Sequence, residues 1–150
     1  MVAGVLWSLL GILAGAFVAT QAPINAALGR GLGLPVAAAA ISFLVGAIVL
    51  GLVTAAMTQT QGVSLGWRTP APWLFVAGGV LGAAFVTSGV LLVPRIGAAA
   101  TMAFLVTGQL LAGLVMDRIG FLGLAVREIT LGRVAGALML LSGALLIRLT

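Results

Sequence analysis

The sequence predicts an all-α integral membrane protein with five transmembrane helices. Apolar residues make up 63% of the 150 residues and charged residues only 6%, whereas soluble domains average roughly 45–50% and 25%. The apolar residues form long continuous runs rich in Ala, Gly and Leu, without the period-two alternation of membrane β-barrels. Because a backbone in lipid must satisfy its own hydrogen bonds, such runs form helices.

Five ranges can each form a spanning helix within a single transmembrane domain, residues 1–150. A span needs about 20 mostly apolar residues. The ranges that meet this condition are about 2–25, 34–57, 73–93, 98–116 and 131–149. The first range carries no charge and is longer than the apolar region of a signal peptide, so we expect a retained helix.

Glycine and proline mark the short turns between these helices. The run from Gly29 to Gly33 predicts a turn after the first helix, because glycine adopts unusual dihedral angles at little steric cost. Pro35 suits the first turn of the second helix, where its missing N–H group would be unpaired anyway. Only Pro94 to Gly97 separates the third and fourth helices, which predicts a tight antiparallel connection.

Two longer polar connections, Thr58 to Pro72 and Asp117 to Thr130, separate the remaining helices. The centre of the second one is apolar enough to lie on the membrane surface. The fifth helix is short, because only Val134 to Ile147 is free of charge, a length of about 21 Å. We therefore expect Arg133 and Arg148 to snorkel towards the surface, or the bilayer to thin.

The composition argues against an enzyme, a metal site and a bound cofactor. The chain has no Cys, His or Tyr, which removes disulfides, thiolate and imidazole ligands, and Ser-His or Cys-His nucleophilic pairs. Its two carboxylates, Asp117 and Glu128, both stand beside arginines in one polar connection, so almost no residues are available for general acid–base catalysis. The net charge of +5 comes from seven scattered arginines, which does not predict nucleic-acid binding.

Gln21 and Asn25 are the first candidate functional residues. They stand four residues apart and share a helix face, and an amide within a bilayer needs a hydrogen-bond partner. Intramembrane polar groups usually face a bundle interior or a cavity, which favours a functional site. The alternative is that both amides lie at headgroup level and only end the first helix, with Pro23 loosening its last turn.

Gln109 is the remaining amide expected inside a helix, about halfway along the fourth. Its role stays open between a structural hydrogen bond to a facing carbonyl or threonine and a contact with substrate. We expect Gln21, Asn25 and Gln109 to line a polar path that binds substrate through neutral hydrogen bonds. The hydroxyl groups expected to support them are those of Ser42, Thr101 and Thr107.

Small residues recur at spacings of four, three and four in three helices. The sets begin at Gly4, Gly78 and Gly132, and each falls within one narrow stripe of its helix. Such stripes let helix backbones approach closely in lipid. We therefore predict helix contacts, and not ligand contacts, at the following positions: Gly11, Gly15, Gly78, Gly82, Gly132 and Gly136.

The arginines bear on orientation in the membrane. With five helices the two termini lie on opposite sides. Four arginines fall on the N-terminal side and three on the other: Arg68, Arg118, Arg127 and Arg133 against Arg30, Arg95 and Arg148. An excess of one is hardly enough for the positive-inside rule. Either the N-terminus is cytoplasmic in every copy, or copies insert both ways round, as an antiparallel homodimer requires.

Several motifs in order resemble the YdcZ-type branch of the drug/metabolite transporter superfamily, which is related to the small multidrug resistance exporters. They are Gln21-x-x-x-Asn25-x-x-Leu28, Ala40 to Gly46, Gly79-x-x-Gly82, Pro94 to Ala98 and Gly108-Gln109. The resemblance implies a five-helix half-transporter in the bacterial inner membrane, acting with a second copy or with an oppositely oriented paralogue. Small multidrug resistance proteins couple export to protons through a glutamate in the first helix, but this chain has no acid from Met1 to Met116.

We therefore expect a small-molecule transporter that works as an antiparallel homodimer with a polar site near the midplane, because alternating access generally needs two repeats of opposite orientation. A strongly charged substrate is not expected, since no carboxylate is available at depth. The alternative is a non-transporting or partner-dependent subunit of a heterodimer or larger complex. Substrate identity, transport direction and coupling ion are not encoded in any recognisable pattern.

Overall fold

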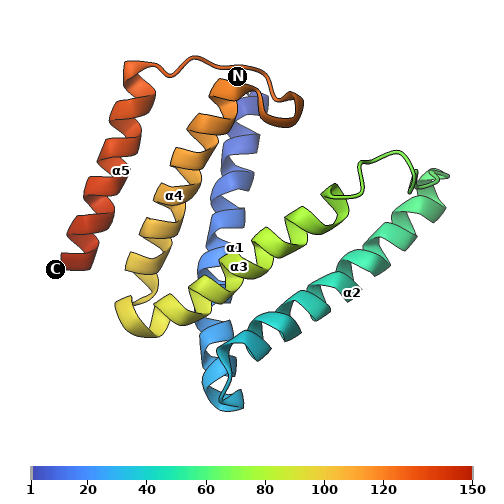
Figure 1. The fold of residues 1–150 in the computed structure, drawn as a ribbon, viewed down its shortest axis with the longest axis horizontal. Coiled ribbons are helices and arrows are strands. Elements are labelled where there is room, and N and C mark those ends of the chain that lie inside the picture. Colours follow the sequence, from blue (N-terminus) through green and yellow to red (C-terminus); the bar gives the residue numbers. More distant parts are fainter. Residues whose placement is uncertain (1, 150) are drawn as a thin grey trace. The chain divides into compact units, whose positions relative to one another are not determined.

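The computed structural model describes residues 2–149, and its regular structure there is entirely helical (Figure 1). In chain order the elements are α1 (Val2–Leu32), α2 (Pro35–Gln61), α3 (Leu74–Ile96), α4 (Ala98–Ile119), the short 3-10 helix η1 (Phe121–Gly123) and α5 (Leu131–Leu149). Among the described residues, five helices are long and apolar enough to cross a membrane. The predicted all-α class with five spanning helices is confirmed, and dimerisation stays a prediction.

α1 is longer than the sequence predicted. It ends at Leu32, seven residues beyond the expected limit at residue 25 (32 minus 25), and Pro23 lies inside it. Proline removes one backbone donor, which transmembrane helices tolerate better than soluble ones. The predicted Gly29 to Gly33 turn is confined to its end, because the backbone takes a positive φ, of 72°, only at Gly33. Gln21 and Asn25 therefore do not end the helix, so this part of the alternative is wrong; their depth in the membrane stays a prediction.

The other helices also extend into the predicted connections. α2 ends at Gln61, where Gly62 adopts the left-handed conformation with φ 63° and ψ 23°. α3 includes Pro94, so only Gly97 separates it from α4, with φ 80° and ψ 163°, a region accessible essentially to glycine alone. α4 continues to Ile119 and therefore contains Asp117, which the sequence had placed in a polar connection.

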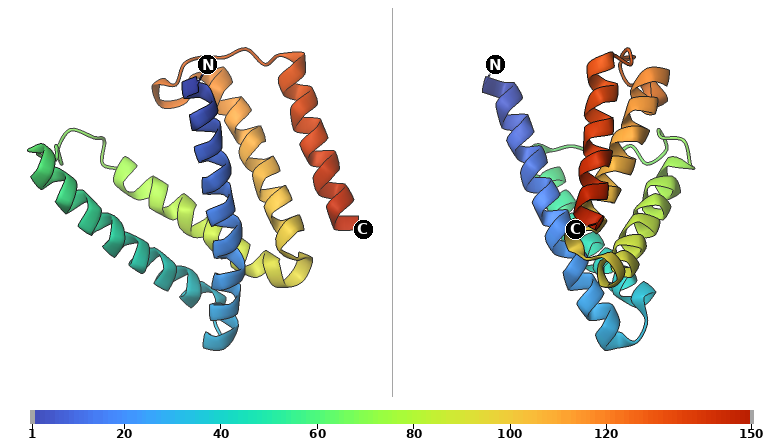
Figure 2. Two further views of the ribbon diagram at one scale, coloured as in Figure 1. Left: turned by 180° about the vertical axis from the view of Figure 1, so that it is seen from behind. Right: turned by 90° about the vertical axis from the view of Figure 1, so that its left-hand side faces the viewer.

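The chain divides into two compact units, one up to Pro94 and one from Arg95 onward. In the first unit α1 packs against α2, and α3 approaches both, with Gly89 beside Ala22 and Gly82 beside Phe43. In the second unit α4 and α5 lie side by side, joined by the connection that holds η1 (Figures 1 and 2). The prediction that residues 1–150 act as a single domain stays a prediction.

Alanine makes most of the close contacts. The buried apolar residues are Ala22, Ala26, Ala38, Ala39 and Val90 in the first unit, and Ala100, Ala137 and Ala144 in the second. The methyl group of alanine lets helix backbones approach closely where there is no hydrophobic driving force between helices in lipid. Nearly all large apolar side chains point outwards, as expected for surfaces that face lipid or another protein.

Arginines stand at the helix ends. Arg30, Arg95, Arg118 and Arg148 occupy the last turns of α1, α3, α4 and α5, where a positive charge interacts favourably with the helix dipole. Arg133 is different, because it lies near the start of α5 and pairs with Asp117 of α4 at 3.1 Å. Arg133 thus forms an ion pair between the two helices, and its snorkelling towards the membrane surface stays a prediction.

Candidate functional site

Three predicted residues of the first unit meet in one cluster. The side-chain amide of Gln21 donates a hydrogen bond to the Ser42 hydroxyl oxygen (Nε2 to Oγ, 3.1 Å). The amide of Asn25 donates to the same oxygen (Nδ2 to Oγ, 3.2 Å). Gln21 and Asn25 come from successive turns of α1 and Ser42 from the second turn of α2. We call Gln21, Asn25 and Ser42 the amide cluster.

The amide cluster keeps polar capacity for a ligand. A serine hydroxyl has two acceptor lone pairs and one donor proton, and each primary amide has two donors and one acceptor oxygen. The two bonds to Ser42 use both of its lone pairs and one donor from each amide. Among the described residues, the hydroxyl proton, the second N–H of each amide and both amide oxygens have no further partner, so the cluster can both donate and accept without carrying a charge.

The amide cluster opens into a pocket of about 320 Å³, which we call the α2 pocket. Its polar lining comes from Gln21 and Ser42 and its apolar lining from four residues of α2: Phe43, Gly46, Ala47 and Leu50. Asn25 is buried behind it, with 5% of its surface exposed. No charged residue lines the α2 pocket, which therefore suits an uncharged molecule with one polar end and one hydrocarbon end.

The sequence interpretation missed the apolar wall of this pocket. Ser42, Gly46 and Leu50 follow one another at intervals of four along α2, which places them on one side of the helix. That spacing could have identified the wall. The spacing is a weak signal, because α2 is apolar on most of its surface and Ser42 and Gly46 are small residues that do not mark a distinct face.

Phe43 is held against α3 by Gly82. A Cβ atom built at Gly82 would lie 3.0 Å from Cζ and 3.3 Å from Cε1 of the Phe43 ring. We expect Gly82→Ala to be less stable than Gly78→Ala by about 1–3 kcal/mol, the usual range for overpacking. Gly78 is the matched control on the same helix, because no described atom lies within 4 Å of its Cβ position.

Unfolding of both variants by titration with sodium dodecyl sulfate in mixed micelles provides the measurement. Equal midpoints for the two variants would show that the contact between Gly82 and Phe43 does not contribute to the packing of α2 and α3.

The other predicted polar residues lie in the second unit. Thr101 and Thr107 are buried, but each hydroxyl donates to the backbone carbonyl oxygen four residues earlier, that of Gly97 and that of Ala103, at 2.7 Å. Such bonds satisfy the hydroxyl locally. Gln109 is exposed and lines a groove between α4 and α5 whose lining also includes Asp117 and Arg133. None of the three makes a described hydrogen bond to the amide cluster, so their role in a substrate path stays a prediction.

Most of the predicted packing glycines have open space beside them. No described atom lies within 4 Å of the Cβ position at Gly11, Gly15, Gly78, Gly132 or Gly136. Gly82 is the one member of the predicted set with a close neighbour. Contacts at the other five positions stay a prediction, and they would have to come from lipid or from another protein.

Comparison with known proteins identifies the family. The family described as "Putative inner membrane exporter, YdcZ" matches residues 6–146, nearly the whole chain. No curated protein and no solved structure matches. The match reaches into both units and all five α-helices, and it indicates a transporter. The chain therefore belongs to the YdcZ family of the drug/metabolite transporter superfamily and is a multi-pass protein of the inner membrane.

Proposed function

We propose that the chain exports small, uncharged, amphipathic molecules, which bind with a polar group at the amide cluster and a hydrocarbon part in the α2 pocket. The observation that carries this proposal is the shared acceptor: two amides of α1 converge on one hydroxyl of α2, at the edge of a pocket of about 320 Å³. The family description supports export as the direction.

The absence of charge at the amide cluster sets the substrate class. An ionised group brought out of water needs an opposite charge or a dense set of hydrogen bonds, and otherwise its transfer costs several kcal/mol. The α2 pocket offers only one amide, one hydroxyl and hydrocarbon. A neutral hydroxyl, carbonyl or amide group on the substrate would fit the remaining donors and acceptors.

The helix lengths support a site inside the membrane. Asn25 stands seven residues before the end of α1, and Ser42 stands seven residues after the start of α2. At 1.5 Å per residue, both lie about 10 Å from the α1–α2 turn. Half of a hydrocarbon core is about 15 Å. With that turn at the membrane surface, the amide cluster lies inside the membrane but somewhat short of the midplane.

The unpaired glycine face of α1 supports an antiparallel homodimer as the working form. The stripe of α1 that holds Gly11 and Gly15 has no described neighbours within 4 Å of the Cβ positions of these glycines. A second copy inserted the other way round would supply the inverted repeat that alternating access generally uses. The balance of four arginines against three permits both insertions.

Export can be tested although the substrate is unidentified. Cells that express the wild-type chain, or the same chain with Ser42→Ala, are grown side by side, and the solutes in the two spent media are compared by mass spectrometry. We expect at least one uncharged amphipathic compound to accumulate outside in a Ser42-dependent way. Media that do not differ, at equal amounts of protein in the membrane, would contradict the proposal.

Orientation is a separate prediction, which uses the lack of native cysteine. Gly31 and Ser64 are exposed and lie near opposite ends of α2. In intact cells, a membrane-impermeant thiol reagent should label about half of the copies at Gly31→Cys and about half at Ser64→Cys, as dual insertion requires. Labelling of nearly all copies at one site and nearly none at the other would exclude the antiparallel homodimer and indicate an oppositely oriented partner.

A further inference from the structure

The second unit contains a groove between α4 and α5 with a charged end. We call it the α4–α5 groove. It has a volume of about 400 Å³ and is lined by Gln109, Leu110, Gly113, Leu114, Asp117, Arg133 and Gly136. The charged residues Asp117 and Arg133 lie near the end of α4 and the start of α5. Leu110, Gly113 and Leu114 lie nearer the middle of α4, and Gly136 lies about one turn further into α5 than Arg133. The groove is therefore amphipathic along its length and belongs to membrane-spanning segments.

Arg133 carries a hydrogen-bond donor that the described residues do not satisfy. Its Nη1 atom lies 3.1 Å from Asp117 Oδ2, which pairs the two charges. The same Nη1 atom is buried and has no hydrogen-bond partner among the described residues. The contact is thus an ion pair whose N–H groups are not directed at the carboxylate oxygen. The Arg133 side chain as a whole is 29% exposed, so its other guanidinium donors can meet a ligand that brings acceptor oxygens.

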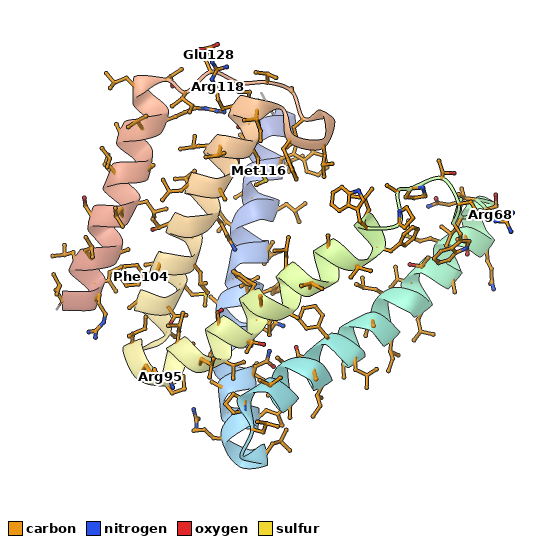
Figure 3. All side chains as sticks on the ribbon, viewed as in Figure 1. Arg68, Arg95, Phe104, Met116, Arg118 and Glu128 are labelled. Carbon is orange, nitrogen blue, oxygen red and sulfur yellow. The ribbon has the colours of Figure 1, made fainter. Side chains whose placement is uncertain are left out.

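The charges around this end of the groove favour an anion. Arg118 lies 3.9 Å from Glu128, with both side chains exposed, and Figure 3 shows the two side by side at the α4–α5 connection. The backbone N–H of Arg127 donates to the carbonyl oxygen of Asp117 at 2.9 Å, which places the Arg127 backbone next to the last turn of α4. The exposed side chain of Arg127 does not itself line the groove. Arg127 has no ion pair among the described residues. Three arginines against two carboxylates leave a net charge of +1.

We propose that the α4–α5 groove binds an acidic phospholipid, with an acyl chain along Leu110, Leu114 and Gly113 and with its phosphate group against Arg133 and Arg127. Phosphate oxygens are strong acceptors for guanidinium donors, and basic pockets between transmembrane helices bind acidic headgroups. The hydrocarbon lining favours a lipid over a soluble anion. This site is made wholly of second-unit residues and does not depend on the amide cluster.

Native mass spectrometry of the purified chain in detergent tests the proposal. The chain is titrated with phosphatidylglycerol, with phosphatidylcholine of the same acyl chains, and with glycerol phosphate, which has the acidic group but no chains. We expect one phosphatidylglycerol to bind at least about fivefold more tightly than phosphatidylcholine, because one basic residue near an acidic lipid contributes about that factor. We expect glycerol phosphate not to compete at equal concentration.

Matched variants test the contributions of arginine charge and of groove shape to lipid binding separately. Arg127→Gln should weaken phosphatidylglycerol binding by about fivefold, whereas Arg148→Gln at the far end of α5 should not. Gly136→Leu should block the groove without changing any charge, because no described atom lies near its Cβ position. Gly143→Leu is its control, since Gly143 also has open space at that position but does not line the groove.

Three outcomes would overturn the proposal. Equal affinity for phosphatidylglycerol and phosphatidylcholine would show that the arginines do not select the headgroup. Competition by glycerol phosphate would identify a soluble anion as the ligand. Equal effects of Gly136→Leu and Gly143→Leu would place the lipid elsewhere. None of these measurements involves transport. Lipid binding can therefore be disproved while the export function stands, and export can be disproved while lipid binding stands.

Discussion

Replacing the amide cluster by apolar side chains of similar shape should lower export about 30-fold, while the free energy of unfolding stays within about 1 kcal/mol of the wild-type value. The triple variant is Gln21→Met, Asn25→Leu and Ser42→Ala. Two neutral hydrogen bonds to substrate, at about 1 kcal/mol each, account for a change of that size in export. Stability should persist, because removing all partners together leaves no buried polar group unpaired.

Ser42→Ala alone should behave differently. It removes the common acceptor and leaves the amides of Gln21 and Asn25 without the partner they share. Hydrogen bonds between membrane helices contribute about 0.6 kcal/mol on average and at most about 1.7. With two bonds lost at once, we expect a destabilisation of about 1–2 kcal/mol. The single variant should therefore be less stable than the triple variant, although it contains fewer changes.

Two measurements on each variant decide between a binding and a structural role for the amide cluster. Stability is measured by titration with sodium dodecyl sulfate in mixed micelles, and export by the extracellular amount of the Ser42-dependent compound. Ser88→Ala is the control, because among the described residues the Ser88 hydroxyl bonds only to the Ala84 carbonyl oxygen of its own helix, at 2.8 Å. A triple variant that unfolds easily but still exports would mean that the amide cluster only holds α1 to α2.

The second large effect is expected at Gly29, where α1 meets the start of α2. Gly29→Leu should destabilise the chain by about 3 kcal/mol, the upper end of overpacking costs. A Cβ atom at this position would lie 3.1 Å from Pro35 Cα, 3.4 Å from Val90 Cγ1 and 3.6 Å from Ala38 Cβ. Since Pro35 Cα is a backbone atom, no rotamer change can relieve the contact, and α1 and α2 must separate.

Gly31→Leu is the matched control for this substitution. Gly31 lies in the same last turns of α1, but no described atom comes within 4 Å of its Cβ position. We expect its free energy of unfolding to change by no more than about 0.5 kcal/mol, as for most surface substitutions. If Gly29→Leu and Gly31→Leu unfolded at the same detergent fraction, the close approach of Gly29 to Pro35 would not be a feature of the native packing.

The helix boundaries show which structural features local sequence patterns can predict and which they cannot. The sequence predicted all five spanning segments, because hydropathy and span length are local properties. It ended α1 near Asn25, because proline and glycine usually end helices in water. In the structure the helix continues through Pro23 and Gly29 to Leu32. Packing of α1 against α2 in this region, with Asn25, Ala26 and Gly29 buried, compensates for the weak local preference.

The pairing of Asp117 with Arg133 is a second feature that local sequence patterns do not predict. The sequence placed Asp117 in a loop and expected Arg133 to reach for the membrane surface. In the structure both are helical and form an ion pair across α4 and α5, at one end of the α4–α5 groove. No local pattern connects two residues that stand sixteen positions apart across a connection (133 minus 117), so their pairing depends on how the two helices pack.

The sequence by itself determined the class of this protein, its five membrane spans and its family, because composition, hydropathy and ordered motifs do not depend on which residues touch. It also selected Gln21, Asn25 and Ser42 as polar residues inside the membrane. Only the tertiary structure decided that these three meet, since Ser42 lies 21 and 17 residues from the two amides. The physical reason is that lipid offers no hydrogen bonds, so the packing of α1 against α2 must supply each buried amide with a partner.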